Sequence, residues 1–240
     1  MDNRFTIMEV RDFWDTIADS YESSHDHIKE AHFQRFEEAH KHMILKRGMN
    51  VLNVWSRTGE AIPYLREQCK DINLYNLEVS PKFIKIARKH FPDEYFTETD
   101  LTLFHFEAGF FDYILSLETL EHAPKPLEFL RECKRVLKPG GILVMSLPPA
   151  AVEVPAALFR LFVNDHGEGP HRFLSSKTVK RLLREAGMKL IVHKSTLLIP
   201  VGPKFVRDFG ERVIQSFPNT FISELGIRQF YIACNDPLEK

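Results

Sequence analysis

Short apolar runs alternate with amphipathic segments along most of this chain. From residue 51 onward, compact apolar runs of strand length are separated by stretches whose apolar residues recur at helical spacing. This alternation is typical of βαβ units built around a parallel sheet. The pattern predicts strands at 51–55, 72–79, 111–117, 141–147, 189–194 and 229–234, with a short strand ending near Phe96. It predicts helices at 62–68, 81–90, 127–136 and 176–186.

Two further amphipathic stretches precede the first predicted strand. Residues 10–24 and 32–46 both carry apolar side chains at helical spacing, which predicts a pair of N-terminal helices. In an open parallel sheet, ligands bind outside the carboxyl ends of the strands, where the strand order reverses. The residues that follow predicted strand ends are therefore those to search for chemistry, after Trp55, Leu77, Phe96 and Leu117.

The size of the chain favours one domain. At 240 residues it can bury a substantial core as a single α/β unit, and it shows no internal repeat or low-complexity linker. We expect a single domain over 1–240, with three parts. These are an N-terminal helical cap at 1–48, a cofactor-binding core at 49–148, and a substrate cover with the C-terminal half of the sheet at 149–240.

Charge and cysteine content narrow the classes of partner. The chain has 32 Lys+Arg against 33 Asp+Glu, so it has no global basic field to attract a nucleic acid. Its 3 cysteines are far apart and show no paired metal-ligand spacing, which argues against a disulfide framework and a zinc site. We expect a cytoplasmic protein, with neither a signal peptide at the N-terminus nor a transmembrane segment.

A series of spaced motifs lies at the predicted strand ends. The segment VLNVWSRTG occupies 51–59, LEVSP follows at 77–81, TDL at 99–101, SLETLEHAP at 116–124 and LKPGG at 137–141. In this order and spacing the chain resembles the small-molecule, type 11-like branch of the class I S-adenosylmethionine-dependent methyltransferases over nearly its whole length. The resemblance implies a Rossmann-like α/β fold, a mostly parallel seven-stranded sheet with helices on both faces.

The same resemblance implies S-adenosyl-L-methionine as cofactor and assigns residues to it. Glu78 ends a strand where its carboxylate can accept hydrogen bonds from both ribose hydroxyls, and Val79 follows it. Asp100 and the amide of Leu101 are placed to contact the adenine edge. The remaining assignments are Tyr21, closing over the methionine end, and Leu117. A solvated loop acid at 78 or 100, and an aromatic packing residue at 21, are the alternative interpretations.

The first motif departs from the family. Trp55 and Arg57 stand where the family has its first two glycines, Asn53 replaces the usual acid, and Gly59 remains. A bulky residue at positive φ costs about 1–2 kcal/mol, and its side chain extends toward the methionine pocket. Two interpretations follow. Asn53, Trp55 and Gly59 still hold the cofactor in a shifted loop, or the protein is a catalytically degenerate methyltransferase that acts as a binding or scaffolding partner.

Candidates for acceptor chemistry lie nearer the C-terminus. His122 is the candidate general base, because an imidazole titrates near neutral pH; a helix-capping histidine is the alternative. His166 and His171 are candidate contacts to the substrate, and we expect no bound metal. Apolar residues at 152–162 and 197–201 favour a small, hydrophobic acceptor, although a core face or a homodimer contact would have the same composition.

Overall fold

The computed structural model describes residues 4–21, 29–150, 169–199, 203–217 and 220–236. Within these residues one seven-stranded sheet has the order β3-β2-β1-β4-β5-β7-β6, in which β7 runs antiparallel to both of its neighbours. The predicted mostly parallel sheet is therefore confirmed. The strands are β1 (Asn50–Val54), β2 (Asn73–Glu78), β3 (Tyr95–Glu98), β4 (Phe111–Leu117), β5 (Leu137–Leu147), β6 (Lys189–Thr196) and β7 (Arg228–Cys234).

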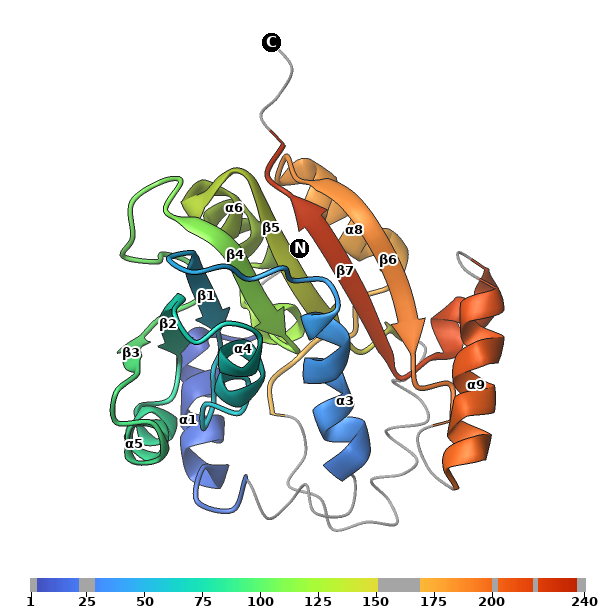
Figure 1. Cartoon of the computed structure of the whole chain (residues 1–240), viewed down its shortest axis with the longest axis horizontal. Helices are drawn as coiled ribbons and strands as arrows, with labels where there is room; N and C mark the ends of the chain where they lie inside the picture. Colours follow the sequence, from blue (N-terminus) through green and yellow to red (C-terminus); the bar gives the residue numbers. More distant parts are fainter. Residues whose placement is uncertain (1–3, 22–28, 151–168, 200–202, 218–219, 237–240) are drawn as a thin grey trace.

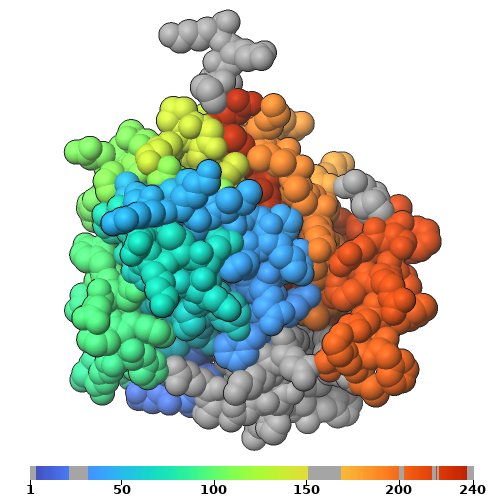
Figure 2. Space-filling view, in the orientation of Figure 1, coloured from blue at the N-terminus to red at the C-terminus, as the bar shows by residue number. Residues whose placement is uncertain are grey.

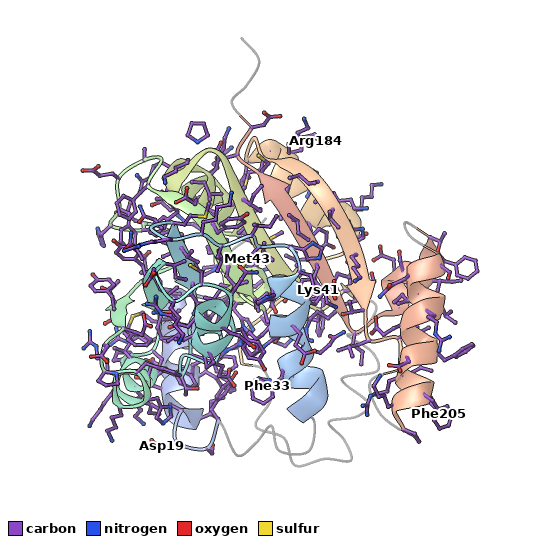
Figure 3. The ribbon with its side chains drawn as sticks, in the orientation of Figure 1. Asp19, Phe33, Lys41, Met43, Arg184 and Phe205 are labelled. Carbon is purple, nitrogen blue, oxygen red and sulfur yellow. The ribbon has the colours of Figure 1, made fainter. Side chains whose placement is uncertain are left out.

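Helices cover both faces of the sheet, as expected (Figure 1). On the near face α3 lies beside α4, and the space-filling view shows α3 between α4 and α9 (Figure 2). Phe33 of α3, labelled in Figure 3, stacks on Tyr64 of α4, with ring centroids 6.5 Å apart. The helices are α1 (Ile7–Ile17), α3 (Lys29–His40), α4 (Ile62–Gln68), α5 (Pro81–His90), α6 (Pro126–Val136), α8 (Ser176–Glu185) and α9 (Lys204–Ser216).

The central elements agree closely with the sequence prediction, except that β5 begins at Leu137 instead of residue 141 because Leu137 already pairs with Phe111 of β4. Both N-terminal helices begin and end earlier than predicted. Helix α1 begins after Thr6, which forms a capping box with Glu9, and it ends at Ile17 instead of residue 24. Helix α3 spans 29–40 instead of 32–46, because the chain tightens there into a turn in which the amide of Met43 donates to the His40 carbonyl. Tyr21 therefore lies beyond α1 and not on it.

One helix was missed altogether. No helix was predicted between the strands at 189–194 and 229–234, but residues 204–216 form α9, which packs beside β6. Its buried face is narrow, since Gly210 and Ile214 are its buried residues, while Phe205 and Phe209 are exposed. Figure 3 places Phe205 near one end of this helix. Its apolar residues nevertheless recur at helical spacing, so the sequence carries a periodic signal for this helix.

The carboxyl ends of β1, β2, β3 and β4 meet at one edge of the sheet, and the strand order reverses between β1 and β4 (Figure 1). The backbone is unusual there. Among the described residues other than glycine, five have positive φ, and four of these follow a strand end at this edge: Trp55 (61°), Arg57 (49°), Leu101 (62°) and Glu118 (53°). Such conformations cost about 1–3 kcal/mol each and gather at functional sites.

Candidate cofactor site

The loop after β1 has the conformation that its missing glycines require. Trp55 and Arg57 both adopt positive φ, so the turn keeps a glycine-like path although it carries large side chains. Gly59 is needed as glycine, because it has a φ of 90° and a Cβ there would lie 2.7 Å from the Phe91 ring. The chain therefore preserves the turn and fills the space that glycines would leave open.

Glu78 ends β2 in a fully buried position at the centre of this edge. Its Oε2 atom accepts the amide of Arg57 at 2.6 Å, and its Oε1 atom accepts the amides of Val79 at 2.8 Å and Ser80 at 3.0 Å. Burial raises the pKa of Glu78 to about 7, against the lowering effect of these hydrogen bonds. The carboxylate therefore organises the loops after β1 and β2 and is not a solvated loop acid.

Asp100 and Leu101 follow β3 and differ sharply in exposure. Asp100 is exposed, and its Oδ1 atom accepts the amides of Thr102 at 2.8 Å and Leu103 at 3.1 Å, which lowers its pKa against the effect of partial burial. The amide of Leu101 donates to the Thr99 hydroxyl at 3.2 Å, and its side chain is fully buried. The carboxylate is accessible from solvent, whereas the Leu101 amide already has a partner.

The Arg57 side chain turns inward and lies among three aromatic rings. Its Cζ atom is 5.2 Å from the ring centroid of Trp14, 5.6 Å from that of Trp55 and 5.7 Å from that of Tyr21. Its Nη2 atom donates to the main-chain oxygen of Glu118 at 3.3 Å. We call the rings of Trp14, Tyr21 and Trp55 the aromatic cage. Trp14 was not among the predicted site residues, and it is part of this aromatic cage.

Tyr21 and Asn53 both form hydrogen bonds with other side chains of the protein. Tyr21 is buried and its hydroxyl donates to Glu60 at 3.3 Å; burial raises the pKa of this phenol to about 12. Asn53 donates from Nδ2 to the side-chain oxygen of Asn76 on β2 at 2.9 Å, so it joins two strands. Leu117 is buried in the core on the α3 and α4 side. An acid was expected at 53 in the family, and here an amide pair replaces it.

His122 lies behind the aromatic cage, with its ring centroid 4.7 Å from that of Trp55. Its Nδ1 atom is 2.9 Å from the carbonyl oxygen of Pro170, so Nδ1 carries the hydrogen and Nε2 is the acceptor of the neutral ring. Burial lowers the pKa of His122 to about 3. His171 lies nearby, with ring centroids 5.8 Å apart. The structure thus brings these two histidines together and keeps His122 neutral.

A buried ionic network on the α3 side was not predicted from the sequence. Arg35 of α3 donates from Nη1 to Glu118 at 2.6 Å and from Nη2 to Glu60 at 3.1 Å, and Arg228 of β7 donates to the other oxygen of Glu118 at 2.6 Å. Although burial opposes ionisation, Arg228 and Arg35 hold the pKa of Glu118 well below its usual range. An arginine within the predicted helix at 32–46 was the available signal, but the partners of Arg35 are 25 and 83 residues distant in sequence.

A small pocket lies beside the β1 loop. It is lined by Arg35, Glu60 and Arg57 among others, and neither Glu78 nor Asp100 lines it. Glu78 and Asp100 suit a ribose and an adenine by residue type and position. The Arg57 side chain reaches from the β1 turn to the β4 end.

Several sequence expectations concern residues outside this description. His166 and the apolar stretch at 152–162 lie outside the described residues. Within the described ranges, no three His, Cys, Asp or Glu side chains come together as a metal site. In the same ranges no helix is both long and apolar enough to cross a membrane.

The chain has recognisable relatives. Residues 52–145 match a family described as a methyltransferase domain. A ubiquinone biosynthesis O-methyltransferase of Xanthomonas axonopodis pv. citri is 30% identical over 125 residues, which is 48% of this chain and 52% of that protein. The chain thus spans about half the length of the curated relatives it matches.

Solved structures share the fold over nearly the whole chain. One is a chain in the complex between a methyltransferase activator of Haloferax volcanii and a methyltransferase, with a TM-score of 0.73, 20% identity and coverage of 96% of this chain and 99% of that one. Another is an S-adenosylmethionine-dependent methyltransferase of Thermotoga maritima, with a TM-score of 0.67, 18% identity and coverage of 93% and 99%. At these identities the likeness shows the fold, which is the Rossmann-like fold predicted from the motifs.

Proposed function

We propose, from the premise that this chain belongs to the class I S-adenosylmethionine-dependent methyltransferases, that it transfers the methyl group of this cofactor to a small acceptor molecule. The observation that carries the proposal is Glu78 at the end of β2, buried and held in place beside the β1 loop. A carboxylate fixed there is suited to two ribose hydroxyls, and Asp100 at the end of β3 is suited to an adenine amino group.

The residues of this chain align the reacting groups and exclude water from the methionine end of the cofactor. When bound, the cofactor supplies a methyl group on a sulfonium, and the transfer is an in-line displacement that depends on alignment. Trp14, Tyr21 and Trp55 wall the methionine end with aromatic surface and keep water from it. His122, with Nδ1 donating to Pro170, offers Nε2 to a hydroxyl of the acceptor. Because its pKa is about 3, it serves as a hydrogen-bond acceptor that orients the nucleophile and only as a weak base.

The acceptor is proposed to be an apolar molecule with a hydroxyl group. The curated relatives are named as O-methyltransferases of ubiquinone biosynthesis, which is support for a ring-bearing, hydrophobic acceptor. His171, beside His122, is the described residue placed to contact it, and His166 is a further candidate. In this proposal residues 49–148 hold the cofactor and residues 149–240 cover the acceptor. One observation favours a second candidate function, a degenerate binding protein: Arg57 already fills the methionine place.

Equilibrium binding tests the proposal. Calorimetric titration with S-adenosylmethionine and its demethylated product should show binding that Glu78→Ala weakens at least 100-fold. Glu98→Ala is the matched control, because Glu98 ends the neighbouring strand in register with Glu78 but is exposed and paired with Arg11. Glu78→Gln keeps the side-chain shape in case the alanine variant unfolds. An affinity that is unchanged in both Glu78 variants would contradict the proposal. So would the absence of binding at millimolar ligand even in a variant in which glycine replaces Arg57 in the β1 loop.

A further inference from the structure

Arg57 is an unusual buried cation because it has few hydrogen bonds. Its side chain is 5% exposed. Among the described residues its guanidinium makes one hydrogen bond, at 3.3 Å to the Glu118 carbonyl, and its Nε atom has no hydrogen-bond partner. A buried polar atom without a partner costs free energy, and so does the positive φ of this residue. The three rings around the guanidinium supply compensating attraction, together with the carboxylates of Glu60, Glu78 and Glu118, whose pKa values the charge of Arg57 lowers.

The aromatic cage is a general site for a compact cation. Each ring centroid lies within about 6 Å of Cζ, the range in which a ring face attracts a positive charge. The same physics serves a guanidinium, a quaternary ammonium or a sulfonium, because each presents positive charge to the negative faces of the rings. The cage would therefore hold a ligand cation if Arg57 were elsewhere.

The aromatic cage also lies where the proposed binding mode would place the reactive end of the cofactor. The main chain of Arg57 donates to Glu78, the carboxylate assigned to the ribose, while its side chain reaches the backbone at the β4 end. A ligand whose ribose lies at Glu78 and whose methionine part runs toward the β4 end would bring its charged sulfur to the cage. The Arg57 guanidinium and that sulfur compete for one place.

We propose that Arg57 is a built-in occupant of a three-ring cation site, and that it excludes sulfonium ligands from the cofactor site until its side chain leaves the cage. This inference rests on the proposed function for the identity of the ligand, but not for the existence of the cation site.

A carboxylate lies close to the Arg57 side chain. Arg57 and Glu60 both line a small pocket beside the β1 loop, and the charge of Arg57 already helps to lower the pKa of Glu60, so a guanidinium that left the rings would remain near this carboxylate. Glu60 is ionised at neutral pH: burial opposes this, but the hydrogen bond from His32 and the charge of Arg35 lower the pKa to about 2. An exchange from rings to carboxylate therefore keeps the cation paired.

A small cation tests the site without the cofactor. The chain has 2 tryptophans, Trp14 and Trp55, and both belong to the cage, so intrinsic fluorescence reports on its occupant. In Arg57→Gly, which suits the positive φ, trimethylsulfonium should change the emission saturably, at a concentration at least 10-fold lower than in the unaltered protein. The neutral tert-butanol, of similar size, should not. Arg57→Lys, which keeps a cation, should behave like the unaltered protein, and Arg57→Ala repeats the test if the glycine variant is unstable.

The cofactor then separates this inference from the proposed function. Calorimetry should show S-adenosylmethionine binding at least 10-fold tighter in Arg57→Gly than in the unaltered protein, with a smaller gain for the uncharged thioether product. Equal gains for both ligands, or equal trimethylsulfonium binding in the two proteins, would overturn the inference. Micromolar binding by the unaltered protein with no gain in the variant would overturn it while leaving the proposed function intact. Trimethylsulfonium binding without cofactor binding would support the cation site and refute the proposed function.

Discussion

At the end of β2 the candidate site is shaped by hydrogen bonds to backbone in ordinary conformations, whereas at the end of β1 it is shaped by large residues in a strained backbone. Glu78 is held by three main-chain amides, and the helix that follows begins with Ser80 as its N-cap. After β1, Trp55 and Arg57 occupy a turn that suits glycine, and their side chains fill the space beside it. Two neighbouring strand ends at one edge of the sheet are therefore shaped in different ways.

The difference shows that two properties of such a turn, its backbone path and the open space beside it, can be separated. A backbone path is fixed by hydrogen bonds and sheet position, so it survives substitution of the residues along it. The open space beside the path depends on side-chain size alone and is lost as soon as large residues appear. The β1 turn keeps the backbone path, but a packed aromatic cluster fills the space beside it.

The largest effect is expected from removing the centre of that cluster. Trp14→Ala should lower the free energy of unfolding by about 3–5 kcal/mol, the usual cost of deleting a buried large aromatic side chain. Trp14 contacts Trp55 and His122 with ring centroids 5.6 Å away in each case. Urea denaturation followed by circular dichroism measures the change. Trp14→Phe is the matched control and should cost far less, since Nε1 of Trp14 has no hydrogen-bond partner to lose. Equal losses in both variants would mean that ring packing is not what Trp14 provides.

An intermediate effect is expected from Glu60, which faces the cage from the β1 side. Its folded pKa is about 2, below the ordinary 4.5, so it stabilises the folded state above pH 4.5 and loses that contribution as the pH falls toward 2. The shift corresponds to at most about 3 kcal/mol. Glu60→Gln should therefore be less stable than the unaltered protein at pH 7, and the gap should close with acid. Denaturant titrations at a series of pH values test this, with the exposed Glu67→Gln as control. A gap independent of pH would exclude an ionic role.

The smallest change in stability is expected from a substitution that relieves the backbone strain of the β1 turn. Arg57→Gly gains by relieving a positive φ and loses cation–π contacts, so the two contributions of about 1 kcal/mol should nearly cancel. Gly59→Ala, two residues along, has no such compensation, because its Cβ would meet the Phe91 ring. Thermal unfolding should place Arg57→Gly near the unaltered protein and Gly59→Ala clearly below it. A strong destabilisation by Arg57→Gly would show that the cage depends on its cation for folding.

Local periodicity was sufficient to predict the central elements. Helices at 62–68 and 81–90 and the strand at 111–117 have the predicted bounds, because each combines an apolar pattern with clear terminal residues. The ends of α1 and α3 were wrong, since a capping box and a tightened turn decided them. Helix α9 was not predicted, although its apolar residues recur at helical spacing.

By itself, the sequence determined the sheet, the strand ends and the residues placed at them, including Glu78, Asp100 and the glycine-poor turn. These follow from patterns that repeat within a few residues of one another. Only the tertiary structure decided where side chains point from those ends. It turned Asn53 to its neighbour Asn76, Glu118 to Arg35 and Arg228, and Arg57 into the aromatic cage. The reason is physical: a strand end fixes the position of a backbone, whereas the direction of a large side chain depends on which charges and rings the fold brings from distant parts of the chain.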